Sequence, residues 1–290
     1  MIVTRLGGGV GHQLFQYAAG RRLAAARGVP LLIDRSAVDA DARAFALEPF
    51  NISAAEAPAG TRAEYEAATL GARLMARLQR RQLVKERTPR FDPAVLSLPG
   101  DVYLDGQWQS EQYFLDAANT IRRDLEWRTP PASWSPELVT RIGSGHAVSV
   151  HVRRGDRVSD PRLAAVQGTC PVAYYRRAWR LIRERVQDPW FAVFSDDPAW
   201  ARAHLTFLDP VKFVSDPGHR PDADDLWLMT QCGHHVIANS AFSWWGAWLS
   251  KAPNQVVVAP DRWFADAAYD GRDVVPPAWA RVSVDSAVTT

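Results

Sequence analysis

Hydrophobic and polar positions alternate in short blocks that predict an α/β fold from the first residues onward. Residues 2–6 form an apolar run typical of a buried strand, and residues 13–27 follow a helical spacing that Gly28 ends. Residues 30–34 predict the next strand. A strand, a helix and a second strand in this order form a βαβ unit, which implies a parallel sheet.

The next hundred residues carry a weaker pattern. Residues 35–60 give no clear element, whereas residues 61–90 favour a helix with Leu70, Leu74 and Leu78 on one stripe. Residues 102–104 predict a strand, and residues 111–125 a helix. The segment TPPASWS at 129–135 is typical of a linker, because paired prolines end regular elements. We therefore predict two domains, 1–132 and 133–290.

The second half repeats the alternation of strands and helices. Apolar runs at 147–152, 191–194, 212–214, 236–238 and 256–259 predict strands, and the last of these is expected to be the final strand. Helices are expected at 171–186, 198–204, 225–233 and 242–249. This pattern predicts a second Rossmann-like parallel sheet.

The amino-acid composition and net charge limit the kinds of function that this protein can have. Of the 290 residues 47% are hydrophobic and 23% charged, and the net charge of +2 is too small to indicate a nucleic acid partner. Two cysteines make no disulfide framework and suit a reducing compartment. No charged leader and no apolar run of about 20 residues is present. We expect a cytoplasmic protein without a signal peptide.

The predicted helix at 61–90 carries eight basic and three acidic residues. Most such runs are a solvated helix face. The alternative is peripheral contact with an anionic membrane surface, at the inner face of the membrane.

The glycine-rich loop at 7–11 follows the first predicted strand. It is not a dinucleotide fingerprint, because the third glycine of G-x-G-x-x-G would fall on His12, and no Lys-Ser/Thr follows as in a phosphate-binding P-loop. Glycines also allow a backbone to approach a ligand closely. His12 can hydrogen-bond a hydroxyl group and can accept a proton.

Two further strand ends carry polar residues. The carboxyl end of the strand at 102–104 leads into Gln107, Trp108, Gln109 and Ser110, where α/β proteins place ligand contacts. An equally weighted alternative is that Ser110 only caps a helix. Asn239 and Ser240 follow the strand at 236–238, where anions bind in open parallel sheets, although Ser240 or Ser243 could equally serve as a cap.

The run HVRRGD at 151–156 ends the first strand of the second half. His151 and Arg153 share one face of that strand, and Arg154 points to the other. An arginine at such a strand end can bind a diphosphate with two parallel hydrogen bonds, although a surface Arg-Asp turn is the simpler interpretation. Arg154 is better placed for a salt bridge to Asp196 or Asp197.

The remaining acidic and histidine pairs favour structural roles. Asp197 precedes Pro198 as expected for a helix cap, which leaves Asp196 as the functional member of the pair. The triplet at 222–224 is interpreted as a helix start and not as a metal site. Adjacent His234 and His235 cannot easily bind one ion, so we predict no metal.

Several of these runs together resemble one family. GGGVGHQLFQYAAGRRLA, DGQWQSEQYF, HVRRGD, FSDDPAW and MTQCGHHVIANSAFSWWGAWLS are similar to the motifs of the α-1,2-fucosyltransferases of glycosyltransferase family 11, in the family's order. The resemblance implies a GT-B fold, with two Rossmann-like domains facing across a cleft. It implies an inverting, metal-independent transfer of L-fucose from GDP-β-L-fucose to the 2-hydroxyl of a terminal galactose.

The resemblance also implies roles for individual residues. The first domain would bind the galactose-terminated glycan and the second the GDP-fucose, with no other cofactor. Catalysis would involve Arg153, Asp156 and His12, although the family usually has Asn at position 12. The alternatives are an α-1,6 linkage, or a glycan-binding protein without turnover. The implied donor contacts are His151, Arg153, Arg154, Asp196, Asp225, Asn239, Ser240, Phe242 and Ser243, and the implied acceptor contacts are His12, Gln13, Gln107, Trp108, Gln109 and Ser110.

Overall fold

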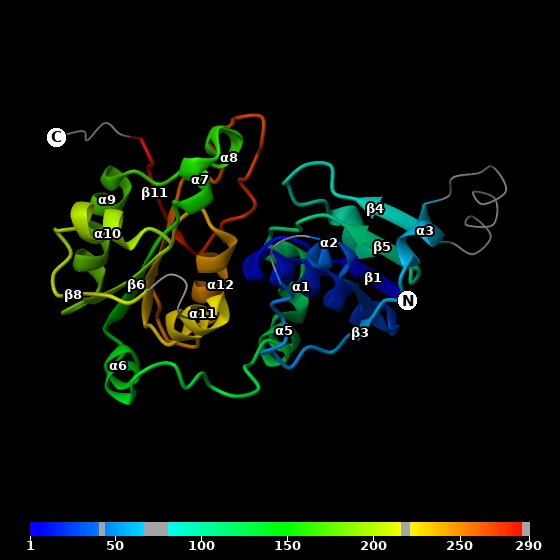
Figure 1. The fold of residues 1–290 in the computed structure, drawn as a ribbon, viewed down its shortest axis with the longest axis horizontal. Helices are drawn as coiled ribbons and strands as arrows, with labels where there is room; N and C mark the ends of the chain where they lie inside the picture. The colour runs from blue at the N-terminus through cyan, green and yellow to red at the C-terminus, as the bar shows by residue number, and fades with distance from the viewer. Residues whose placement is uncertain (41–43, 67–80, 216–220, 286–290) are drawn as a thin grey trace. The chain divides into compact units, whose positions relative to one another are not determined.

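The computed structural model describes residues 1–40, 44–66, 81–215 and 221–285, and these form two α/β units (Figure 1). The first unit covers Met1–Arg128 and the second Thr129–Thr290. The division between the units falls at the start of the proline-rich segment at 129–135, four residues before the predicted boundary.

The first unit is built on a parallel sheet of five strands in the order β3-β2-β1-β5-β4. The chain therefore proceeds from β1 outward to β3 and then returns to the other side of β1. The gap between β1 and β5 is a topological switch point, where ligands bind in such sheets. The strands are β1 Ile2–Arg5, β2 Leu31–Asp34, β3 Ala55–Glu56, β4 Gln82–Lys85 and β5 Val102–Asp105.

Helix α1 (Val10–Arg27) packs closely on this sheet. A Cβ atom at Gly20 would lie 3.0 Å from side-chain atoms of both Thr4 and Leu31, so glycine permits the close approach. Gly28 ends the helix with φ of 62°, as predicted. The other helices are α2 Ser36–Asp39, α3 Thr61–Tyr65 and α5 Ala118–Asp124, with 3-10 turns η1 Pro93–Ser97, η2 Glu111–Tyr113 and η3 Leu115–Ala117.

Two helix predictions in this unit are wrong in part. Residues 82–85 form the strand β4 instead of continuing a helix, because Leu83 packs onto the cluster of Val3, Tyr65 and Tyr103. The helix expected at 111–125 is two 3-10 turns before α5. The stripe at residues 70, 74 and 78 lies outside the described residues, together with the rest of residues 67–80 of the proposed membrane-contact segment at 61–90.

The second unit contains a parallel sheet of six strands in the order β11-β10-β9-β6-β7-β8. Here the switch point lies between β6 and β9. β9 begins two residues earlier than predicted, and β10 is followed by one further strand, so the expected last strand is not the last. The strands are β6 Ala147–Val152, β7 Trp190–Ser195, β8 Val211–Phe213, β9 His234–Val236, β10 Val257–Pro260 and β11 Ala280–Val282.

Helices cover both faces of this sheet (Figure 1). One face packs on α9 (Val172–Arg185) and α10 (Pro198–His204), and the other on α6 (Pro136–Ile142), α11 (Asp222–Thr230) and α12 (Ala241–Leu249). Two short helices that the sequence analysis missed, α7 (Gly155–Ser159) and α8 (Pro161–Gln167), follow β6. The tryptophans of α12 are buried, which makes them core residues and not sugar-binding surfaces.

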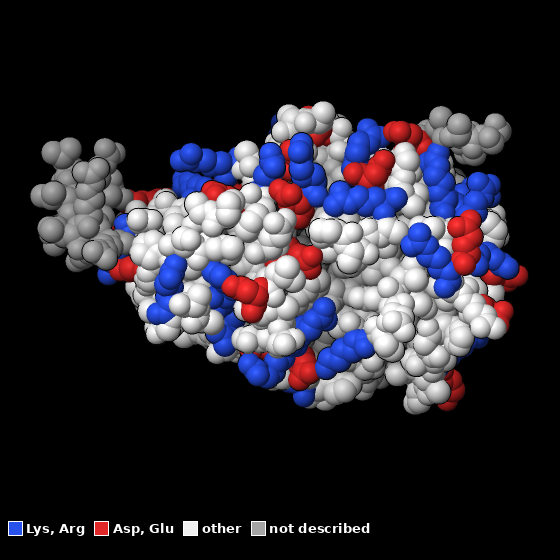
Figure 2. Space-filling view, turned by 180° about the vertical axis from the view of Figure 1, so that it is seen from behind, with Lys and Arg blue, Asp and Glu red and all other residues white. Residues whose placement is uncertain are grey.

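The surface carries both signs of charge. Figure 2 shows Lys and Arg interspersed with Asp and Glu over the face that it draws. Within the described ranges, no helix is long and apolar enough to cross a membrane.

Candidate functional site

The carboxyl ends of β6, β7 and β9 bring together most of the predicted donor residues at the switch point of the second sheet. Arg153 lies at the centre of this group. Its Nη2 donates to Asp156 Oδ1 at 2.6 Å, and its Nη1 donates to Asp196 Oδ2. Two carboxylates thus fix the guanidinium, whose remaining N–H groups stay available for a ligand.

Gly155 is required by this arrangement. A Cβ atom at residue 155 would lie 2.7 Å from Asp196 Oδ2 and 3.2 Å from Arg153 Nη1. Any larger residue would therefore push the carboxylate away from the guanidinium.

Arg154 forms a salt bridge with Asp197, one of the two partners predicted from its position on the opposite face of the strand. Its Nε donates to Asp197 Oδ2 at 3.1 Å, and its guanidinium lies 4.2 Å from the centre of the Trp200 ring. Asp197 also caps α10 by accepting a hydrogen bond from the Trp200 backbone, as predicted. Arg154 therefore anchors α10, and its predicted contact with the donor stays a prediction.

His151 is a buried neutral imidazole. The residue is 5% exposed, and burial, followed by the charges of Arg153 and Arg157, lowers the pKa of His151 to about 3. Its Nδ1 has no hydrogen-bond partner among the described residues, and its ring centre lies 5.4 Å from that of Phe242. A neutral ring with an unused nitrogen can bind a polar ligand atom at neutral pH.

The start of α12 offers backbone donors without a side-chain cap. Ser240 is the cap residue, but no side chain accepts a hydrogen bond from the first turn of the helix. The first N–H groups of a helix have no partner within the helix, and they carry a partial positive charge. The capping alternative for Ser240 and Ser243 is therefore wrong.

Two residues predicted to contact the donor, Asn239 and Ser243, form hydrogen bonds with the protein backbone. Asn239 Nδ2 donates to Gln167 O at 2.7 Å and to Trp263 O at 3.0 Å. Ser243 is fully buried, and its hydroxyl donates to carbonyls of the preceding loop. Both side chains have structural roles, because they donate hydrogen bonds to backbone carbonyls of nearby loops, and their predicted contacts with the donor stay predictions.

The acidic triplet at 222–224 begins α11, as predicted. Asp224 Oδ2 accepts a hydrogen bond from Ser133 at 2.6 Å, and Asp225 Oδ2 accepts one from Ser215 at 2.5 Å. In the part of the chain that the structure describes, no three His, Cys, Asp or Glu residues come together as a metal site would need.

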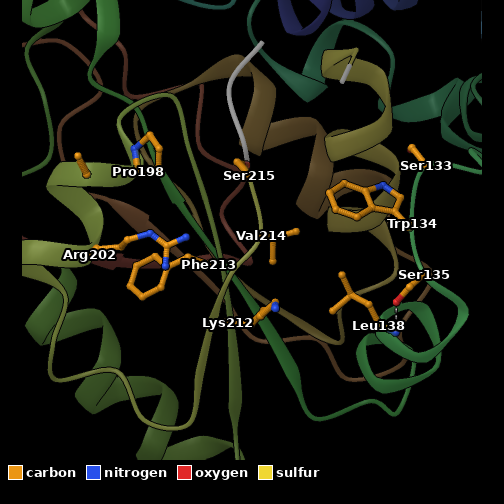
Figure 3. Close-up of a pocket in the computed structure, with 11 residues that line it drawn as sticks. Ser133, Trp134, Ser135, Leu138, Pro198, Arg202, Lys212, Phe213, Val214 and Ser215 are labelled. Atoms are coloured by element: carbon orange, nitrogen blue, oxygen red, sulfur yellow. Dashed lines mark hydrogen bonds between the residues drawn. The ribbon is translucent and has the colours of Figure 1, made fainter. Parts of the chain in front are cut away.

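A pocket of about 670 Å³ lies within the second unit (Figure 3). Two of its lining residues are linked to residues described above: Pro198 follows Asp197 in the chain, and Ser215 donates a hydrogen bond to Asp225. Its volume is in the range typical of small-ligand sites. The sequence analysis missed it, because the pocket combines residues far apart in the chain. The lining residues are Ser133, Trp134, Ser135, Leu138, Pro198, Ala199, Arg202, Lys212, Phe213, Val214 and Ser215.

The predicted acceptor residues lie at the switch point of the first sheet, after β1 and β5. Gln107 is exposed there, and its side-chain oxygen accepts a hydrogen bond from Gln16 Nε2 at 3.4 Å. His12 is partly exposed in the first turn of α1. Gln13 is fully buried and binds the backbone of Gly8, Ala44 and Ala46, so it is corrected to a structural residue.

The neighbouring Trp108 is not a sugar-stacking surface. It is 1% exposed, and its ring packs edge-on against Tyr113 at 5.4 Å. Ser110 is fully buried and caps η2, so the capping alternative is correct for this residue. Gln109 is 8% exposed.

Two residues that support this loop were not found from the sequence. Glu86, at the end of β4, accepts hydrogen bonds from the backbone N–H of Gln107 at 2.6 Å and of Trp108 at 3.0 Å. Burial raises the pKa of Glu86 despite these bonds. Gln16 binds Gly7 N through its oxygen and so joins the two loops. The repeat of Gln13 and Gln16 on one helical face was the available signal for Gln16.

Comparison with known proteins places this site in a family. A profile described as "Glycosyl transferase family 11" matches residues 86–283. An "Alpha-1,2-colitosyltransferase" from Escherichia coli is 31% identical over 97% of this chain and 99% of its own length. The chain belongs to glycosyl transferase family 11. The resemblance seen in the motifs is thereby confirmed.

Two further proteins are similar, one over part of the sequence and one in fold. A human "Galactoside alpha-(1,2)-fucosyltransferase 1" is 35% identical over 106 residues, which cover 36% of this chain and 28% of that one. A solved structure of the fucosyltransferase NodZ from Bradyrhizobium matches with a TM-score of 0.50 and 17% identity over 93% of this chain and 96% of its own. At that identity the match supports the fold, which is of the GT-B type.

Proposed function

We propose that this family 11 glycosyltransferase moves L-fucose from GDP-β-L-fucose to the 2-hydroxyl of a terminal galactose, with inversion and without a metal. Family membership supports sugar transfer, and the fixed guanidinium of Arg153 supports a nucleoside diphosphate donor. This guanidinium, held by Asp156 and Asp196 at the switch point, is the observation that carries the proposal.

The reaction needs positive charge at the leaving group. The galactose oxygen forms a bond to the anomeric carbon of fucose, and the bond from that carbon to the phosphate oxygen breaks. Negative charge then grows on GDP, where Arg153 and the first N–H groups of α12 would stabilise it. The proton of the hydroxyl passes to a base, for which Asp156 and His12 stay the predicted candidates.

A transfer assay tests the proposal directly. Labelled GDP-fucose is offered to an array of glycans, and the linkage in each product is determined by NMR. An α-1,2-linked product on galactose supports the proposal. An α-1,6-linked product selects the alternative linkage, and glycan binding without transfer or donor hydrolysis selects a binding protein.

Colitosyl transfer is a second candidate, because the relative matched over 97% of this chain carries that name. Colitose is the 3-deoxy analogue of L-fucose, so the two donors differ by one hydroxyl group. A site that hydrogen-bonds this hydroxyl rejects the deoxy analogue strongly. We expect kcat/KM to favour GDP-fucose over GDP-colitose by at least about tenfold, and the opposite ratio would identify a colitosyltransferase.

Activity is expected to be unchanged by EDTA, because charge on the leaving diphosphate is met by protein groups. The assay compares initial rates with and without the chelator, followed by addition of Mn²⁺ or Mg²⁺. Loss of activity that a divalent cation restores would instead assign the acids at 222–224 to a metal.

We also propose that the reaction takes place in the cytoplasm, where nucleotide sugars are present. This proposal rests on the composition and the two unpaired cysteines, Cys170 and Cys232.

A further inference from the structure

A second arginine lies beside Arg153 and has no role in the proposed reaction so far. Arg157 is in α7, and its side chain is partly buried. Its Nη2 donates to Asn239 O at 2.9 Å, and its Nη1 approaches Gly168 O at 3.4 Å. Both partners are neutral carbonyl groups, which fix the guanidinium without forming an ion pair with it. The charges of Asp156 and Asp196 favour its protonated form from a distance.

The nearby carboxylates are already bound to other arginines. Asp156 and Asp196 hold Arg153, and Asp197 holds Arg154. Across residues 1–40, 44–66, 81–215 and 221–285, no carboxylate forms a salt bridge with Arg157.

The nearby thiol of Cys170 does not carry a negative charge that could pair with Arg157 either. Burial raises the pKa of Cys170 to about 12, so this thiol is neutral at physiological pH. Burial and then the charge of Arg153 lower the pKa of Arg157 to about 10. Arginine stays protonated at neutral pH, so this shift describes a cation in surroundings that oppose its charge. A bound anion would remove that opposition.

The position of Arg157 indicates which anion. Its partner Asn239 immediately precedes Ser240, the cap residue of α12, so the guanidinium lies beside the uncapped first turn of that helix. Arg153 is close enough to affect its pKa. A guanidinium with fixed geometry, a second guanidinium and a helix N-terminus together favour an anion with several oxygens.

We propose that Arg157 is a second cationic contact for the diphosphate of the donor, which rests on the proposed function. Arg153 with Asp156 and Asp196 carries a net charge of −1, so Arg157 is the further cation that a diphosphate needs at this place. Arg157 therefore acts with Arg153 and the first turn of α12 to distinguish a nucleoside diphosphate from the bare nucleoside.

Calorimetric titration of the whole protein with GDP and with guanosine tests this assignment. The variants are Arg157→Gln, Arg157→Lys and the matched control Arg177→Gln, whose arginine also donates to two backbone carbonyls, those of Ser283 and Asp285. We expect Arg157→Gln to weaken GDP binding about ten- to a hundredfold and to leave guanosine binding unchanged. Arg157→Lys should retain part of the affinity, because it keeps the charge but not the fork. The control should bind GDP normally.

The outcomes separate this inference from the proposed function. If the wild-type protein binds no GDP, the proposed donor is wrong. If the wild-type protein binds GDP and Arg157→Gln binds it equally well, only the role of Arg157 is wrong. An equal loss for GDP and guanosine, with a lowered melting temperature, also overturns the proposal, because it assigns Arg157 to loop structure.

Discussion

Arg153→Ala is expected to lower kcat/KM for sugar transfer by about a hundred- to a thousandfold, because removal of one fixed donor to a developing negative charge typically has this effect. Asp156 and Asp196 hold the guanidinium in place before the reaction begins, so no reorganisation of Arg153 is needed as the charge develops. The loss should appear in kcat more than in KM, since the charge on the leaving group grows only in the transition state.

The fold should survive this substitution. The side chains of Asp156 and Asp196 are 31% and 26% exposed, so water can solvate them when the arginine is removed. Arg141→Ala is a matched control, because its guanidinium lies 4.4 Å from the centre of the Trp190 ring in the same unit but belongs to α6. Circular dichroism and melting temperature report the fold. Turnover near the wild-type value in Arg153→Ala would refute the phosphate role.

The parts of the fold that the sequence predicted correctly depend on local signals. The strand at 147–152 has apolar residues at four of its six positions, and α10 has Asp197 and Pro198 at its start. Such elements form wherever the pattern occurs, because burial and capping act within a few residues. The two switch points follow from the order of strands, and they place the predicted residues at two edges.

The parts that failed depend on distant partners. β4 is a strand because it pairs with β5, twenty residues further along the chain, although its own window is rich in arginine. Trp108 has φ of 53° and is buried, because Glu86 holds the backbone of this turn from another strand. Asn239 was expected at the donor, yet the loops at 167 and 263 use its amide. In each case the sequence gives the residue type, but it does not show which distant residue will be its partner.

The same limit applies to the candidate site. Arg153 was found from its place at a strand end, whereas Arg157 is the first residue after the motif HVRRGD, which ends at Asp156. Its importance follows from the carbonyl groups of Gly168 and Asn239, which belong to separate segments. A motif defines which residues are near a strand end, and packing decides which of them face a ligand.

Acid is expected to destabilise the protein between pH 6.5 and 5, before carboxylates begin to titrate. Burial lowers the pKa of His151 and of His235 to about 3, whereas both have values near 6.5 in the unfolded chain. Between these values the unfolded state binds protons that the folded state does not, so stability is complete above pH 6.5 and falls as the pH falls. From pH 7 to pH 5 each histidine should remove about 2 kcal/mol from the free energy of unfolding.

Urea unfolding at pH 7 and pH 5 measures this loss in the wild type, in His235→Gln and in His204→Gln. His235 is fully buried and shares a hydrogen bond of 2.8 Å with Ser149, whereas His204 is exposed and serves as the control. His235→Gln should lose about 2 kcal/mol less than the wild type over this interval, whatever its stability at pH 7, because one buried titrating group is gone. The control should keep the full dependence. An unchanged dependence in His235→Gln would show that His235 takes up its proton over the same pH range in the folded and unfolded states. The neutral state inferred for His151, which is also buried, would then need direct measurement by NMR.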